Sequence, residues 1–194
     1  MKRSNRTKQD LATSLKLLMK NSALSDISVQ DLVNNSGISR HTFYYHFIDK
    51  QDLVQWVFRS EVIDPVEQED GDYLDRLVSI LAKMQKEPAF YTKALETYGQ
   101  NSFSEYFFES LLQLTRYCLR DFAEGRGMPL DERVEVFVSR YATHAIVGIT
   151  KDWIKNGMKR DPAALLAPLQ GMLRPVVTLL VEGDLEFPQY EEDE

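Results

Sequence analysis

Apolar residues recur at three- and four-residue spacing along nearly the whole chain, and this periodicity restricts the possible folds more than any other feature. Leu11, Leu15, Leu18 and Met19, for example, fall on one face of a helix near the start. The sequence shows no alternating apolar and polar runs bounded by turn residues, which are typical of strands. Its 194 residues can bury a substantial core, in one domain or in two. We therefore predict an all-α fold.

Capping residues mark two short helices after residue 27. Ser28 is a suitable N-cap, with Asp31 three residues later, for a helix that ends at the run Asn-Asn-Ser-Gly. Gly37 suits the left-handed position after a helix, and Ser39 can cap the next helix at once. Two short helices joined by a tight glycine turn form a helix-turn-helix.

The stretch DPVEQEDGD, residues 64–72, interrupts the helical pattern with a proline, a glycine and a run of acids. A fourth helix, from about residue 50, precedes it. Further helices are predicted at 73–86, 88–98, 102–124, 131–156 and 162–181, the last beginning at the pair Asp161-Pro162. We therefore divide the chain into a helix-turn-helix domain at 1–63, an acidic linker at 64–72, a helical domain at 73–183 and an acidic, disordered tail at 184–194.

Charge is divided unevenly along the chain, whose net charge is −7. Residues 1–60 hold nine Lys or Arg against five Asp or Glu, whereas the remainder holds 14 against 25. A basic first domain and an acidic second one favour a first domain that meets a polyanion. Charge alone is equally consistent with two ordinary solvated surfaces.

Several classes of protein are disfavoured by what the sequence lacks. A single cysteine, Cys118, excludes an intramolecular disulfide and a cysteine-only metal site. Zinc-helix, nucleophile-elbow, phosphate-loop and dinucleotide motifs are missing, so we expect no enzyme, no metal and no cofactor. No apolar run approaches the roughly 20 residues that cross a bilayer, and the polar start lacks a secretory signal. We therefore expect a cytoplasmic protein with no membrane partner.

The helix predicted at residues 39–47 carries an unusual set of side chains. On one face lie Phe43 and Phe47, which would anchor the helix to the core. The other side chains offer hydrogen-bond donors and planar rings of the kind that contact bases and phosphates in a major groove. Ser28 and Lys50 mark helix starts that could offer N–H groups and an ammonium to phosphates. The predicted DNA contacts are therefore Ser28, Ser39, Arg40, His41, Thr42, Tyr44, Tyr45, His46 and Lys50.

Residues 27–54, ISVQDLVNNSGISRHTFYYHFIDKQDLV, resemble the DNA-binding domain of the tetracycline-repressor (TetR) family. The positions that match the family pattern are Thr42, Phe43, Tyr44, His46, Phe47 and Lys50. The chain departs from it at Val33, where alanine is common, and at His41, where a small residue is common. The segments VQDLV and TFYYHF also resemble a subset of the family that includes activators of dihydroxyacetone kinase operons.

The resemblance implies a transcriptional regulator, most often a repressor, that binds a palindromic operator in double-stranded DNA as a homodimer. Its two recognition helices would lie about 34–36 Å apart. It also implies a small-molecule effector bound in the domain at 73–183. Two alternatives stay open: a transcriptional activator, or an adaptor that works through a co-regulator protein and binds no metabolite.

Candidate residues for the dimer and for the effector follow from the pattern of the second domain. Small residues at three-residue spacing and an apolar stripe predict a dimer interface of Ala142, Ala145, Ile149, Leu169, Met172, Leu173 and Val176, unless these stripes fill the core of one subunit. Aromatic residues, several with polar atoms, predict an effector pocket of Tyr98, Phe107, Tyr117, Tyr141 and His144. His144 could instead be a hydrogen-bonded core histidine.

Overall fold

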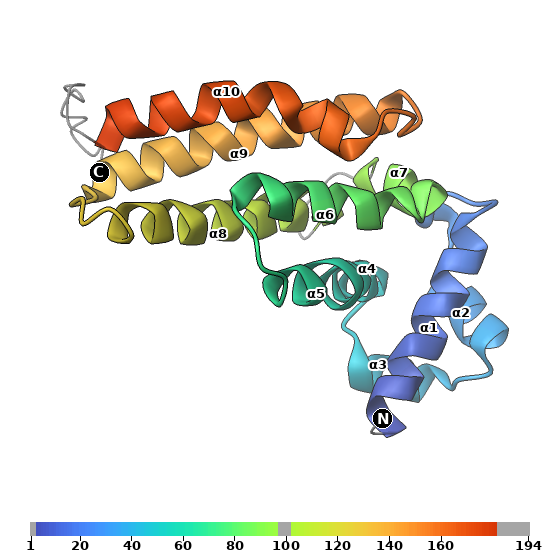
Figure 1. Cartoon of the computed structure of the whole chain (residues 1–194). Coiled ribbons are helices and arrows are strands. Elements are labelled where there is room, and N and C mark those ends of the chain that lie inside the picture. Colours follow the sequence, from blue (N-terminus) through green and yellow to red (C-terminus); the bar gives the residue numbers. More distant parts are fainter. Residues whose placement is uncertain (1–2, 97–101, 182–194) are drawn as a thin grey trace, which may run out of the picture.

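The computed structural model describes residues 3–96 and 102–181, and every regular element in these ranges is a helix (Figure 1). The first group of helices, called the head, consists of α1 (Arg3–Met19), η1 (Leu24–Asp26), α2 (Val29–Ser36) and α3 (Arg40–His46). The second, called the body, consists of α6 (Tyr73–Gln85), α7 (Pro88–Leu95), α8 (Phe103–Glu124), α9 (Glu132–Lys155) and α10 (Pro162–Val181). In α10 the side chains of residues 170 and 173–181 lie outside this description. The predicted all-α fold is confirmed.

A connecting helix joins the head to the body. It consists of α4 (Lys50–Phe58), the π-helical segment η2 (Arg59–Ile63) and α5 (Asp64–Glu67), which follow one another without a break. The helix therefore continues into the stretch expected to be an acidic linker, and only residues 68–72 are irregular. Pro65 has no N–H to donate, and the helix takes the wider π geometry over the residues just before it.

One hydrophobic core extends through the head, the connecting helix and the body. Phe58 lies at its centre, fully buried, with its ring centroid 5.3 Å from that of Phe103 and 5.6 Å from that of Phe107. Edge-to-face packing at such distances adds to the free energy gained from burial. A second, smaller cluster around Leu119 and Val138 lies between α8 and α9.

Two lysines tie the head to the body by polar contacts. Lys93 of α7 donates to the carbonyl oxygens of Met19 (2.6 Å) and Lys20 (3.1 Å), at the end of α1. A cation is favoured there because the last carbonyls of a helix have no partners inside it. Lys16 of α1 forms ion pairs with Glu61 of the connecting helix and with Glu87 at the start of α7. The orientation of the head therefore depends on the connecting helix and on α7.

Candidate nucleic-acid interface and effector pocket

The local geometry of the helix-turn-helix agrees with the capping residues in the sequence. The Asp31 amide donates to the Ser28 hydroxyl (3.1 Å), and the Ser28 amide donates to the Asp31 carboxylate (2.8 Å). Hydrogen bonds from the Ser28 hydroxyl and amide lower the pKa of Asp31. Gly37 follows α2 with φ of 69°, and the Thr42 amide donates to the Ser39 hydroxyl at the start of α3. The predicted capping box, glycine turn and second cap are confirmed.

The α3 helix is held on one side and open on the other. Phe43 and Phe47 are buried in the head, as the sequence indicated, whereas Arg40, His41, Tyr44 and Tyr45 are exposed. Thr42 and His46 are half-buried between these two faces. The Arg40 guanidinium lies 5.6 Å from the centre of the Tyr44 ring, so the two side chains form one cationic and aromatic surface.

Sequence reasoning missed one residue beside this surface. Ile48, in the loop after α3, is 82% exposed, the largest exposure of any large apolar residue in the described part of the chain. Its amide donates to the Asp52 carboxylate (2.9 Å), which holds the loop in place. The sequence did offer a signal for Ile48: it comes directly after α3, and Phe43 and Phe47 already supply the buried face of that helix.

Lys50 does not present a free ammonium to a nucleic acid in this structure. Its Nζ atom donates to the carbonyl oxygens of Leu24 (2.5 Å), Ser25 (3.0 Å) and Ile27 (2.8 Å). An ammonium has three donors, and these three carbonyls accept from all of them. Partial burial lowers the pKa of Lys50, although Asp26 and Asp49 oppose the effect. Lys50 therefore attaches α4 to η1, and its expected phosphate contact stays a prediction.

The residues predicted for the effector pocket do not come together. Tyr141 and His144 lie on the exposed face of α9 beside Ala145, and the His144 ring packs against Phe108 with centroids 4.7 Å apart. Phe107 is buried in the main core, and Tyr98 lies outside the described residues. Of the four described members of the set, only Tyr117, 60% exposed on α8, lines either of the two pockets described below.

The residues predicted for the dimer interface are also divided. Ala142 is only 5% exposed and faces the inside of the body. Its small side chain permits the close approach of α9 to α8. Ala145 and Met172 are exposed, and Ile149 and Leu169 are half-buried. The side chains of Leu173 and Val176 lie outside the described residues. The large apolar side chains exposed on α9 are instead Val136, Phe137 and Tyr141.

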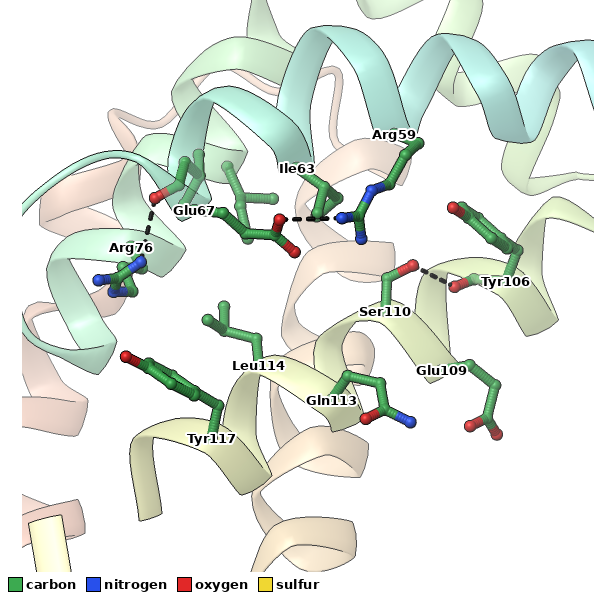
Figure 2. A pocket seen from close by; sticks show the side chains of 12 residues that line it. Arg59, Ile63, Glu67, Arg76, Tyr106, Glu109, Ser110, Gln113, Leu114 and Tyr117 are labelled. Atoms are coloured by element: carbon green, nitrogen blue, oxygen red, sulfur yellow. Dashed lines mark hydrogen bonds and ion pairs between the residues drawn. The ribbon is translucent and has the colours of Figure 1, made fainter. Parts of the chain in front are cut away.

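A pocket of about 590 Å³ lies between the connecting helix, α6 and α8 (Figure 2). Its apolar wall includes Ile63, Ile80 and Leu114, and its polar residues include two arginines that sequence reasoning missed. Arg59 donates to Asp64 (2.6 Å) and to Glu67 (2.9 Å). Arg76 donates to the carbonyl oxygen of Val66 (3.1 Å), in the last turn of the connecting helix.

A second pocket, of about 740 Å³, adjoins the first and shares Arg76 and Tyr117 with it. The Tyr73 and Thr115 hydroxyl groups, 2.9 Å apart, form one of its walls. Burial raises the pKa of Tyr73 to about 12 and that of the nearby Cys118 thiol to about 11. Both groups are therefore protonated and neutral at neutral pH.

The described residues offer neither a membrane span nor a metal-binding cluster. No helix among them is long and apolar enough to cross a membrane. Residues 3–96 and 102–181 also contain no group of three or more His, Cys, Asp or Glu side chains arranged to hold a metal ion.

The molecule combines a capped helix-turn-helix, an exposed cationic and aromatic helix, and a larger helical body. This combination defines the class of helix-turn-helix transcription regulators. The family model TetR_C_8, described as "Transcriptional regulator C-terminal region", matches residues 71–175, which is more than half of the chain. The chain therefore belongs to the TetR family of transcriptional regulators, whose members are not enzymes.

Individual relatives agree with this assignment. The chain is 26% identical over 160 residues to the HTH-type dhaKLM operon transcriptional activator DhaS of Lactococcus lactis, covering 81% of this chain and 84% of the relative. A solved structure of the dihydroxyacetone kinase operon activator DhaS superposes with a TM-score of 0.70 at 22% identity, covering 89% of this chain and 97% of that chain. NalD of Pseudomonas aeruginosa, the secondary repressor of the MexAB-OprM efflux pump, gives a TM-score of 0.55 at 21% identity, covering 90% and 99%.

Proposed function

We propose that the chain is a sequence-specific DNA-binding regulator that binds a palindromic operator as a homodimer. The observation that carries this proposal is the geometry of α3. Phe43 and Phe47 fix the helix to the head, and Arg40, His41, Tyr44 and Tyr45 project from it. Arginine and histidine can bond to base edges, and the tyrosine hydroxyls to phosphates. Ile48, beside them, adds an apolar contact for sugars or thymine methyl groups.

The exposed face of α9 supports the dimer. Phe137 and Tyr141 stack with nearly parallel rings, 6.3 Å between centroids, and Val136 is exposed beside them. Exposed aromatic residues in a contiguous group are typical of interfaces, because their burial contributes strongly to association. Met172 of α10 adds a fourth exposed apolar side chain. A two-fold axis beside α9 that runs from the body toward the head would place the two heads on the same side of the dimer.

The two body pockets support a small-molecule effector over an adaptor without a ligand. The first pocket is lined by Ile63, Val66 and Glu67 of the connecting helix, whose other end begins at Lys50 beside η1. A ligand in this pocket would shift the connecting helix only if the helix can adopt two placements and the ligand binds the protein more tightly in one of them. Such a shift would reach the head, because Lys50 fixes the start of the connecting helix to η1.

Selection of bound sites from random double-stranded DNA tests the proposed function directly. It should be done with the full chain at near-physiological salt, because phosphate contacts weaken steeply as salt rises. We expect an enriched inverted repeat whose half-sites lie about one helical turn apart. Arg40→Ala should change the selected sequence, whereas Arg160→Ala, an exposed change between α9 and α10 and outside the proposed interface, should leave it unaltered. No enrichment by a folded dimer would contradict operator binding.

The direction of regulation is proposed as repression by occupation of a promoter. Activation is the second candidate, because the 26% identical relative from L. lactis is named an activator. Transcription in vitro from a promoter that carries the selected operator separates the two. Repression predicts that transcript falls as protein is added, and activation predicts that it rises.

A further inference from the structure

We infer that Arg76 binds the anionic group of the effector, and that the effector is an amphipathic monoanion with a carboxylate head and an aliphatic body. This inference rests on the proposed function of the first pocket as the effector site. Arg76 is half-buried on α6 and lines both body pockets. Among the described residues its guanidinium forms no ion pair, and its one hydrogen bond goes to the Val66 carbonyl oxygen.

The other arginine of the pocket shows why Arg76 is the available cation. Arg59 is already neutralised by Asp64 and Glu67. Glu69, whose charge acts on Arg76 from a distance, is itself ion-paired with Lys83 at 3.0 Å. A partly buried guanidinium without a carboxylate retains donors that bind an external anion well, since hydrogen bonds between charged partners are about twice as strong as neutral ones.

The pocket has opposite charge at its two ends. Figure 2 shows Arg76 and Tyr117 at one end and Glu109 at the other. Glu109, Gln113 and Tyr117 follow one another at four-residue spacing on α8, so the two ends are about 12 Å apart along that helix. Ile63, Ile80 and Leu114 form an apolar wall. A carboxylate at Arg76 with an aliphatic chain along this wall fits, whereas a second carboxylate at the far end would meet Glu109.

The same guanidinium also connects the ligand to the head. Its hydrogen bond to the Val66 carbonyl holds the last turn of the connecting helix against α6. A carboxylate that draws the guanidinium toward the pocket would weaken this contact and so release that turn. Occupation of the pocket would therefore alter the affinity for the operator.

Three probes of equal chain length test the inference: octanoate, 1-octanol and octanedioate. Binding to the full-length protein is measured by titration calorimetry at constant ionic strength. We expect octanoate to bind more tightly than either of the others.

Arg76→Gln should weaken the binding of octanoate about tenfold or more and leave the binding of octanol unchanged. Arg76→Lys should lose less of the affinity for octanoate. Glu109→Gln should strengthen octanedioate. Arg133→Gln, an exposed arginine paired with Asp131, is the control and should alter none of these.

The outcomes separate this inference from the proposed function. Failure of octanoate to bind at millimolar concentration, equal binding of octanoate and octanol, or unchanged octanoate binding by a folded Arg76→Gln protein would each overturn the inference. Thermal melting of each variant verifies folding. Selection of DNA by the parent protein without any probe reports on the proposed function alone, because neither a pocket ligand nor a change at Arg76 is involved. If an operator is enriched but octanoate does not bind, the proposed DNA-binding function stands and the proposed monoanionic effector is rejected.

Discussion

Lys50 illustrates how one side chain can have a structural role that its position on the sequence does not reveal. It lies at the start of α4, where a cation close to DNA would contact phosphate. In the structure its three donors are instead taken by carbonyl oxygens around η1. These bonds join the start of the connecting helix to the segment that precedes α2, so Lys50 sets the position of the helix-turn-helix.

Replacing Lys50 with methionine should therefore lower the stability of the protein. The change keeps the aliphatic stem but leaves three carbonyls without their donor, so we expect a loss of about 1–3 kcal/mol. Thermal or urea unfolding monitored by circular dichroism measures it. Lys20→Met, a change at an exposed lysine, is the matched control and should have little effect. Unchanged stability together with a shallower salt dependence of DNA binding would show that Lys50 contacts phosphate instead.

Among the elements, the turn between α2 and α3 determines the direction in which α3 leaves α2. Gly37 holds it with φ of 69°, a conformation that side chains with a Cβ atom rarely adopt. A Cβ atom built at this position meets nothing within 4 Å, so a substitution there introduces backbone strain without a steric clash. The turn thus depends on the conformational freedom of glycine and not on close packing.

Gly37→Ala should destabilise the protein by about 1 kcal/mol, the cost of a left-handed conformation for an ordinary residue. Gly37→Asn should cost less, because asparagine tolerates that conformation better. Chemical denaturation of the two variants beside the parent protein provides the comparison. Equal losses for alanine and asparagine would contradict an explanation based on φ alone.

At the scale of the whole molecule, the head and the body form one packed unit. A single core passes from Leu11 in α1 through Phe58 in the connecting helix to Leu166 in α10. The bonds of Lys93 to the end of α1 and the ion pairs of Lys16 reinforce this contact. A movement of the connecting helix therefore has to change the packing of the head, which is the requirement for coupling between the body and DNA.

The proposed dimer predicts a specific effect of charge on α9. Phe137→Glu would place a carboxylate in the apolar interface and should convert the dimer into monomers, since a central aromatic residue of an interface is often worth about 2 kcal/mol or more. Sedimentation velocity measures the change. Leu17→Glu is the matched control, because Leu17 is 50% exposed on α1 and Phe137 is 51% exposed on α9. A dimer that survives Phe137→Glu would place the interface elsewhere.

Several features of the molecule could be predicted because they depend on neighbours in the sequence. Ser28 and Asp31 are three residues apart and form their capping box whatever surrounds them. Phe43 and Phe47 are four residues apart, so helical periodicity alone places them on one buried face. The start of α10 at Pro162 and the helical character of the whole chain follow from the same local rules.

The candidate site was predicted less well, because it depends on contacts between distant residues. Lys50 meets carbonyls more than twenty residues away in the sequence. Ala142 was expected at an interface between subunits, but small residues also allow helices of one subunit to approach each other, and α9 uses Ala142 in that way. Tyr141 and His144 carry polar atoms suitable for a pocket, yet the packing of α8 against α9 turns them outward.

The sequence by itself determined the helices, their caps and the two faces of the recognition helix, since hydrogen bonding and burial along one helix depend on residues within four positions of each other. Only the tertiary structure decided which face of α9 lies outward and that Asp64–Glu67 continues the connecting helix. It also decided that Arg76 forms no ion pair among the described residues, whereas Arg59 is neutralised by two carboxylates. These outcomes depend on how helices far apart in the sequence pack together, and the periodicity of one helix carries no information about its neighbours.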